Sequence, residues 1–448
     1  MQPSEVHQTL NSVMLADGEP IVVDLERSHG SYLVDALTGN EYLDFFSYFA
    51  SQPVGHNHPR LHEPEFLQKL TLSAISKPTN SDVYTTFLAD FVATFKRVAT
   101  PASMQHLFFI SGGALAVENA LKVAFDWKFR RNLANVQAMA SSKWDYRLEG
   151  GGSRVIHFKE AFHGRTGYTI SLTNTTDPRK HIHFPKFDWP RVLNPKLSFP
   201  VTDKVLAAVK LAEQIAISQI EQAVQQYPGD IAALIIEPIQ GEGGDNHFRL
   251  EFLRELRRLA DEHEFLFVVD EVQSGMGLTG KMWAIEHSEI LPDIIAFGKK
   301  SQVCGIIAGP RIDEVEHNVF QESSRLNSTW GGNLTDMVRS QRYLEIIEEE
   351  ELVANAAQMG DRLLAGLETL AANYALLSNA RGRGLMTAFD LPDSATRGKL
   401  RQTMIEQGLY TLTSGPRSIR FRPLLDVTAE QINKALNILE SSVKKISP

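Results

Sequence analysis

The chain has 448 residues, a net charge of −9 and one cysteine, Cys304. Its length predicts two or three domains, and its hydrophobic (43%) and charged (22%) fractions are ordinary for a soluble globular protein. The charge argues against a nucleic-acid surface, no stretch approaches the roughly eighteen apolar residues of a membrane span, and a lone cysteine excludes an internal disulfide. Because the N-terminus also lacks a secretory signal pattern, we expect a cytoplasmic protein with no nucleic-acid or membrane partner.

Residues 1–60 are predicted to form an irregular arm with short strands. Within the arm, residues 32–46 indicate a hairpin that turns near Gly39. His56 and His58 stand two residues apart in a loop, but no other ligand set is nearby, so we predict no metal site. A helix is expected over residues 64–77.

The first chemically informative turn follows a predicted strand at residues 106–110. Ser111-Gly112-Gly113 forms the turn, and a helix is expected from Ala114. Such a turn leaves backbone N–H groups free at the positive end of the helix dipole, which favours an anion such as phosphate. The segment is neither a P-loop nor a complete GxGxxG motif, so an ordinary strand-to-helix turn remains the alternative.

A second informative loop follows a predicted strand at residues 155–158. In Phe162-His163-Gly164-Arg165, the aromatic ring can stack on a planar group and the guanidinium can bind a carboxylate. Taken alone, the stretch could equally be an ordinary exposed loop. The preceding residues 130–153 are mixed in charge, end in three glycines, and are predicted to form a surface loop.

Strands and helices alternate over residues 105–310. This alternation predicts a doubly wound, mostly parallel sheet in a large α/β domain. The remaining elements expected in this region are a helix over 202–226, a buried strand over 231–236, a helix with the apolar stripe Phe252, Leu256 and Leu259, and a short strand over 306–310.

Two further buried strands, residues 265–269 and 294–297, end on reactive side chains. The first is followed by Asp270 and the second, after a glycine, by Lys299 and Lys300. Active sites of open α/β sheets lie at the carboxyl ends of strands, so a carboxylate and an amine are expected together. An amine that bonds to an aldehyde, an acid that protonates a pyridine nitrogen and a helix end that holds phosphate together suit pyridoxal 5'-phosphate. These patterns do not choose between the two lysines.

The sequence changes character after residue 330. Long amphipathic helical patterns fill residues 334–374, and the acidic run 348–351 is interpreted as a solvated helix face. Short strands and a last helix from Thr428 complete a smaller α+β unit. We therefore predict three parts, which are an N-terminal arm (1–60) contributing to the small domain, a large cofactor-binding domain (61–330) and a C-terminal small domain (331–448).

The chain resembles the class III aminotransferases (ornithine/GABA type) of fold type I over nearly its whole length. The motifs that carry the resemblance are SGGALAVENALK, FHGRTGYT, IIEPIQGEGG, VVDEVQSGMGLTG, PDIIAFGKK and STWGGN. Four further segments, KPTNSDVY, FPKFDWPR, FGKKSQVCG and SRLNSTWGGNLTDMV, are similar to the lysine ε-aminotransferase branch of that family. The family's spacing selects Lys299, six residues after Asp293, as the lysine that bonds to the cofactor.

The resemblance also implies the other members of the site. Asp270 would pair with the pyridine nitrogen, Gln273 would lie near the phenolic oxygen, Gly113 and Ala114 would bind the phosphate, Phe162 would stack on the ring, and Thr329 would reach the phosphate of a neighbouring subunit. A homodimer with active sites completed across its interface is therefore expected.

The implied reaction moves the ε-amino group of L-lysine to 2-oxoglutarate by a ping-pong mechanism, giving 2-aminoadipate 6-semialdehyde and L-glutamate. Arg420 would hold the near carboxylate of 2-oxoglutarate, Arg165 the distal carboxylate of both substrates, and Glu242 would pair with Arg420 when that carboxylate is absent. Gln273 is also expected beside the substrate, whereas Arg422 is expected to point to the opposite face of its strand. Ornithine or 4-aminobutyrate as amino donor, or a mutase or decarboxylase reaction, remain alternatives.

Overall fold

The computed structural model describes residues 1–136 and 151–447. In this part of the chain, a seven-stranded sheet has the order β3-β11-β10-β9-β6-β4-β5. Its strands are β3 (His106–Ile110), β4 (Arg154–Phe158), β5 (Arg191–Val192), β6 (Ile231–Ile236), β9 (Leu266–Asp270), β10 (Ile294–Phe297) and β11 (Cys304–Ala308). Neighbouring strands are parallel except at β11, which runs antiparallel to both β10 and β3. The predicted mostly parallel sheet is confirmed, and β3, β4, β6, β9 and β10 all end at one edge.

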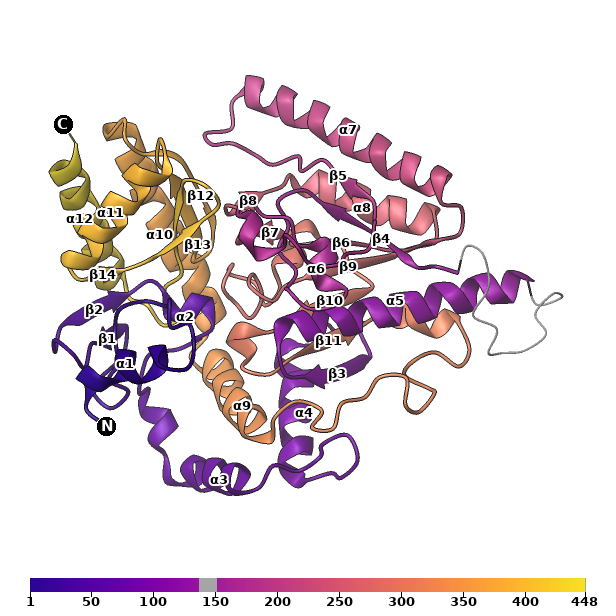
Figure 1. Cartoon of the computed structure of the whole chain (residues 1–448), viewed down its shortest axis with the longest axis horizontal. Helices are drawn as coiled ribbons and strands as arrows, with labels where there is room; N and C mark the ends of the chain where they lie inside the picture. The colour runs from indigo at the N-terminus through magenta and orange to yellow at the C-terminus, as the bar shows by residue number, and fades with distance from the viewer. Residues whose placement is uncertain (137–150, 448) are drawn as a thin grey trace.

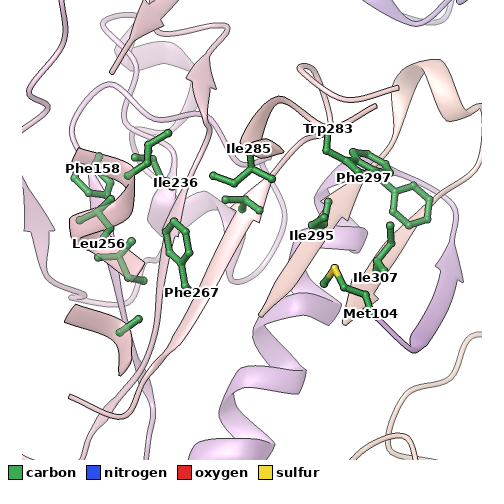
Figure 2. Packing of buried hydrophobic residues seen from close by; sticks show 14 of the residues in the cluster. Met104, Phe158, Ile236, Leu256, Phe267, Trp283, Ile285, Ile295, Phe297 and Ile307 are labelled. Carbon is green, nitrogen blue, oxygen red and sulfur yellow. The ribbon is translucent and has the colours of Figure 1, made fainter. Parts of the chain in front are cut away.

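Helices cover both faces of this sheet (Figure 1). They are α4 (Thr86–Ala99), α5 (Gly113–Val136), α7 (Asp203–Gln226) and α8 (Leu250–Glu262). Alternate residues of β9 enter different cores, since Leu266 and Val268 pack with α5 whereas Phe267 and Val269 pack with α4, α7 and α8. Figure 2 shows the second of these cores, with Phe267 beside Leu256 of α8. The unbroken apolar runs in the sequence are thus explained by burial on two faces.

A second unit is built mainly from the C-terminal quarter of the chain. Its elements are α9 (Leu334–Glu349), α10 (Leu352–Asn373), β12 (Ser378–Arg383), β13 (Met386–Asp390), α11 (Ser394–Glu406), β14 (Leu409–Tyr410), β15 (Leu412–Ser414), β16 (Ser418–Phe421) and α12 (Ala429–Ile446). A four-stranded sheet has the order β12-β13-β16-β15. The predicted helical stretch after residue 334 is divided in two where Glu351 adopts a φ of 52°, and the acidic run at this break is exposed as predicted.

The N-terminal arm packs on this second unit (Figure 1). Its predicted hairpin is confirmed as β1 (Tyr32–Val34) and β2 (Glu41–Asp44), and β2 pairs in parallel with β14. Helix α9 packs against both units, because Leu344 lies in a core of the large sheet and Ile347 lies in the core of the second unit. The division of the chain at residues 60 and 330 therefore remains a prediction.

The remaining α-helices and β-strands lie elsewhere in the described chain. They are α1 (Val6–Asn11), α2 (Ser47–Ala50), α3 (Pro64–Ile75), α6 (Thr169–Leu172), β7 (Ile239–Gln240) and β8 (Asn246–His247). The predicted loop over 130–153 is wrong at its start, since α5 continues to Val136, and residues 137–150 of that prediction lie outside the described residues. Among the helices of the described residues, none has the length and apolar character needed to cross a membrane.

Candidate active site

Strands β9 and β10 place the predicted acid and amine at one edge of the sheet. Ala296 lies opposite Asp270 in the parallel register, and Lys299 follows β10 after Gly298. Lys299 is half-buried and adopts a φ of 53°, a left-handed conformation that non-glycine residues seldom take. Burial and then the neighbouring Arg420 charge lower the pKa of Lys299 to about 8. A lysine with such a pKa is partly neutral near neutral pH, as a nucleophilic amine must be.

The adjacent Lys300 has a different environment. Its side chain is buried, and its ammonium donates a hydrogen bond of 2.8 Å to the carbonyl oxygen of Ala50. Burial, followed by the charge of Arg422, lowers the pKa of Lys300 well below its usual value. Lys300 is therefore engaged with the backbone of the N-terminal arm, which favours Lys299 as the reactive lysine.

Asp270 is held in one orientation by two hydrogen bonds. Its Oδ2 lies 2.8 Å from Nδ1 of the buried His163, and its Oδ1 accepts a hydrogen bond of 3.0 Å from the N–H of Val272. Burial lowers the pKa of His163, but the hydrogen bond to Asp270 raises it, and the net effect is a raised pKa. The sheet edge thus carries a buried carboxylate with an imidazole partner behind it.

The start of α5 forms the predicted anion cradle. The helix begins at Gly113, and the N–H of Ala116 bonds to the carbonyl oxygen of Gly112 at 3.0 Å. The N–H groups of Gly113 and Ala114 precede that bond, so the first turn leaves them available to an anion. A Cβ on Gly113 would lie 2.9 Å from Cγ1 of Val272, which explains the glycine there.

The Phe162 loop is fixed against this helix start. Gly164 has a φ of 124°, and a Cβ on it would lie 2.5 Å from Cβ of Ala114. The N–H of Phe162 donates to Oε1 of Glu237 at 2.9 Å, and Oε2 of Glu237 accepts from the N–H of Gly241 at 3.0 Å. Burial raises the pKa of Glu237 to about 7. One carboxyl group, placed directly after β6, therefore joins two loops of the site.

Two basic side chains lie near the Phe162 ring. The Arg165 guanidinium is 5.7 Å and the Lys180 ammonium 6.0 Å from the ring centroid. Arg165 itself is exposed. An exposed guanidinium near this ring suits the predicted contact with a distal carboxylate.

A network of charged and amide groups lies beside Lys299. Arg420, which is 2% exposed, donates to Oε1 of Gln273 at 3.1 Å and to Oε2 of Glu242 at 3.0 Å. The other oxygen of Glu242 accepts from the ammonium of Lys180. Burial raises the pKa of Glu242, but the positive charges of Arg420 and then Lys180 lower it, and the net effect is a lowered pKa. Glu242 is thus a carboxylate shared by two cations.

The expectation for Arg422 is wrong. Residues two apart in extended chain lie on the same face, so Arg422, directly after the end of β16 at Phe421, points to the same side as Arg420. The guanidinium of Arg422 pairs with the buried Asp245 and also lies 3.3 Å from Oε1 of Gln273. Both arginines therefore fix the amide of Gln273 from the side of the second unit.

The structure brings most of the predicted site residues together. The strand ends, the start of α5 and β16 gather Gly113, Ala114, Phe162, Glu242, Asp270, Gln273, Lys299 and Arg420. Thr329, in contrast, is exposed in the loop before α9, and its role towards a neighbouring subunit remains a prediction. Sequence reasoning did not assign Glu237, although the rule that selected Asp270, an acid directly after a buried strand, points to it. No sequence pattern marks Lys180.

These groups fit pyridoxal phosphate. One edge of the sheet carries a half-buried lysine, a buried carboxylate, free N–H groups at a helix start and an aromatic ring. There is open space beside them at Gly112, where an added Cβ would meet no described atom within 4 Å. When bound, this cofactor supplies an electron sink for the carbanion that forms when the substrate loses a proton. Fold and site together define a pyridoxal-phosphate-dependent enzyme of fold type I.

Comparisons with known proteins specify the family. The model of the family described as aminotransferase class-III matches residues 13–443. The L-lysine-epsilon aminotransferase of Mycobacterium tuberculosis is 49% identical over 99% of this chain and 96% of its own length, and that of Streptomyces clavuligerus is 48% identical over 100% and 96%. The solved structure of the lysine aminotransferase from M. tuberculosis in the internal aldimine form is 48% identical, covers both chains completely and has a TM-score of 0.94. The chain belongs to the class III aminotransferases, and its cofactor is pyridoxal 5'-phosphate.

Proposed function

We propose that this enzyme transfers the ε-amino group of L-lysine to 2-oxoglutarate, giving 2-aminoadipate 6-semialdehyde and L-glutamate in two half-reactions. The names of the relatives that are 48–49% identical over nearly the full length support lysine as the donor. The observation that carries the proposal is the pair formed by Arg420 and Glu242 with 3.0 Å between Nη2 and Oε2. Such a pair lets one site accept two chemically different molecules.

The need for this pair follows from the two substrates. Lysine enters with its ε-amine at the cofactor and an apolar stem near Arg420, where an unpaired buried guanidinium would be costly. Glu242 neutralises Arg420 at this stage. 2-Oxoglutarate instead brings a carboxylate beside the reacting carbon, and this carboxylate takes the place of Glu242 on Arg420. Arg165 binds the distal carboxylate of either substrate.

The remaining residues bind the cofactor and move the proton. Lys299 would hold the cofactor and, when free, would act first as the base and then as the acid for the proton that the substrate carbon loses. Its pKa of about 8 suits both steps. Asp270 would pair with the pyridine nitrogen of the cofactor, and Gln273 would lie near its phenolic oxygen. The start of α5, at Gly113 and Ala114, would hold the phosphate, and Phe162 would stack on the ring.

The working unit in this proposal is a cytosolic homodimer in which Thr329 contacts the phosphate in the other subunit. Large apolar side chains are exposed around its loop, among them Tyr84 (77% exposed) and Trp330 (47%). The loop is tied to the segment before α4, since the Ser81 hydroxyl donates to the carbonyl oxygen of Ser328 at 2.6 Å. Burying these side chains in an interface would remove them from water.

A panel of amino donors tests the proposal. Purified enzyme is given 2-oxoglutarate with lysine, ornithine or 4-aminobutyrate, and L-glutamate formation is measured. We expect the highest kcat/KM with lysine, together with a product that cyclises spontaneously. A preference for ornithine or 4-aminobutyrate would contradict lysine as the donor. Absence of glutamate with every donor would instead favour a mutase or decarboxylase.

A further inference from the structure

We propose that Lys180 is a positioning residue for the acceptor half-reaction. It serves as the second cationic partner of Glu242, which keeps Glu242 paired when 2-oxoglutarate displaces it from Arg420. The inference rests on the proposed function, because it concerns the same exchange of carboxylates at Arg420.

The geometry of the Glu242 carboxylate gives each oxygen its own cation. Oε2 lies 3.0 Å from Nη2 of Arg420, and Oε1 is hydrogen-bonded to Nζ of Lys180. The two cations come from different parts of the fold, since Arg420 belongs to β16 and Lys180 ends the short 3₁₀ helix Pro178–Lys180. The Arg420 side chain is fully enclosed, whereas Lys180 is 20% exposed at the outer side of the carboxylate.

The backbone of Glu242 is held in place on both sides. Its carbonyl oxygen accepts from the N–H of Gly415 at 3.0 Å, and the N–H of the preceding Gly241 donates to Glu237. A Cβ on the following Gly243 would lie 2.3 Å from the carbonyl oxygen of Glu160, so the chain is tightly packed here. Glu242 can therefore leave Arg420 by rotating its side chain, with the contact to Lys180 as the pivot.

The charge balance makes this second partner useful. The positive charges of Arg420 and Lys180 lower the pKa of Glu242 in spite of its burial, so the carboxyl group is ionised at both contacts. When the carboxylate of 2-oxoglutarate occupies Arg420, Glu242 would otherwise be a partly buried anion beside a second anion. Lys180 keeps one ion pair intact during the exchange. No exchange takes place when lysine binds, so the donor half-reaction does not need Lys180.

The neighbouring Arg179 has a different position and supplies a matched control. It is 86% exposed and pairs with Asp177, 2.9 Å between Nε and Oδ1, on the solvent side of the same short helix. Replacing Arg179 removes the positive charge directly before Lys180 in the sequence and leaves the contacts of Glu242 in place.

The test compares the two half-reactions in single-turnover experiments with the Lys180→Met variant. We expect the half-saturating concentration of 2-oxoglutarate, measured on enzyme loaded with pyridoxamine phosphate, to rise about tenfold, the effect of losing about 1.4 kcal/mol of binding. The constants for lysine should change little. Lys180→Arg should restore most of the 2-oxoglutarate value, and Arg179→Met should alter neither half-reaction.

A binding measurement without turnover accompanies the kinetics. Glutarate, a dicarboxylate of the same length as 2-oxoglutarate, is titrated into the holoenzyme in a calorimeter, and its affinity should fall in Lys180→Met as the acceptor constant does. In a Glu242→Gln background, where no anionic side chain has to be moved, Lys180→Met should have no further effect on either readout.

The possible contrary results are distinct. Equal losses for lysine and 2-oxoglutarate would mean that Lys180 binds the distal carboxylate common to both and would overturn the proposal. Unchanged constants in Lys180→Met, or an equal effect in the Glu242→Gln background, would overturn it as well. A failure of the proposed function would appear in the unaltered protein, as the absence of amino transfer from lysine to 2-oxoglutarate.

Discussion

Two adjacent lysines differ in reactivity because their environments differ. Lys299 faces Asp270, Glu242 and Arg420 at the edge of the sheet, and burial lowers its pKa to about 8. Lys300 points to the N-terminal arm and is hydrogen-bonded to the carbonyl oxygen of Ala50. One lysine is thus placed for covalent chemistry and the other for holding two segments of the chain together.

This difference predicts opposite results for the two alanine variants. Lys299→Ala should lose the visible absorbance band of the lysine-bound cofactor and should unfold at nearly the same temperature as the unaltered protein when both lack cofactor. Lys300→Ala should keep the band but lose about 1–3 kcal/mol of stability, because a buried carbonyl oxygen loses its donor. Absorbance spectra and thermal unfolding of both variants measure this. A band that persists without Lys299 and vanishes without Lys300 would reverse the assignment.

Predictability at the residue scale depended on local patterns. Asp270 and the pair Lys299-Lys300 were singled out because they follow buried strands, whose carboxyl ends meet at one edge, and only the family's spacing selected Lys299. Arg422 was misplaced because residues two apart in a strand lie on the same face, not on opposite faces, and Arg420 and Arg422 both reach Gln273. Lys180 was missed because its partner Glu242 is distant in the chain and no spacing rule links them.

At the scale of elements, the turn α2 is the most unusual feature next to the site. Residues Ser47–Ala50 are all left-handed, with φ values from 41° to 66°, although none is glycine. Each such residue costs about 1–2 kcal/mol, so the surrounding contacts must hold the turn. Oδ1 of Asp44 accepts from the N–H groups of Phe46 and Ser47, and Lys300 binds the carbonyl oxygen of Ala50. This strained turn therefore connects the N-terminal arm to the segment that carries Lys299.

A pair of serines tests how the turn is held. The buried Ser47 hydroxyl donates to the carbonyl oxygen of Arg422 at 2.7 Å, whereas the Ser51 hydroxyl donates within the turn to Tyr48 at 2.8 Å and is partly exposed. Ser47→Ala should lower the free energy of unfolding by about 1–3 kcal/mol, because it leaves a buried acceptor unpaired. Ser51→Ala should cost less. Urea unfolding of both variants measures the difference, and an equal cost would contradict this account of the turn.

Elements were predicted better than their arrangement. The four strands predicted between residues 230 and 310 and the helix over 202–226 were located within about two residues, because burial on two faces and a Thr202 cap leave clear local patterns. The antiparallel direction of β11 and the pairing of β2 with β14 were not predicted. Both depend on contacts between residues far apart in the sequence, for which hydrophobic periodicity carries no information.

At the scale of the whole molecule, the exposed loop containing Thr329 raises the question of what completes the site. Lys299 and Asp270 lie at the sheet edge, while Thr329 stands on the surface beside Trp330, whose ring lies 3.7 Å from the ammonium of Lys77. An apolar, exposed surface next to a predicted cofactor ligand is expected of a subunit interface. The proposed homodimer would place this loop on the phosphate of the other subunit.

Mixed dimers provide a direct test of this arrangement. Lys299→Ala and Thr329→Ala subunits, each impaired alone, are co-expressed with different tags so that the mixed dimer can be purified. If Thr329 serves the opposite subunit, one site of the mixed dimer combines an intact Lys299 with an intact Thr329. That dimer should then have about half the activity of the unaltered dimer, because only one of two equivalent sites is intact. If Thr329 instead serves its own subunit, every site lacks one of the two residues, and mixing should not restore activity. A protein that sediments as a monomer would contradict the shared site altogether.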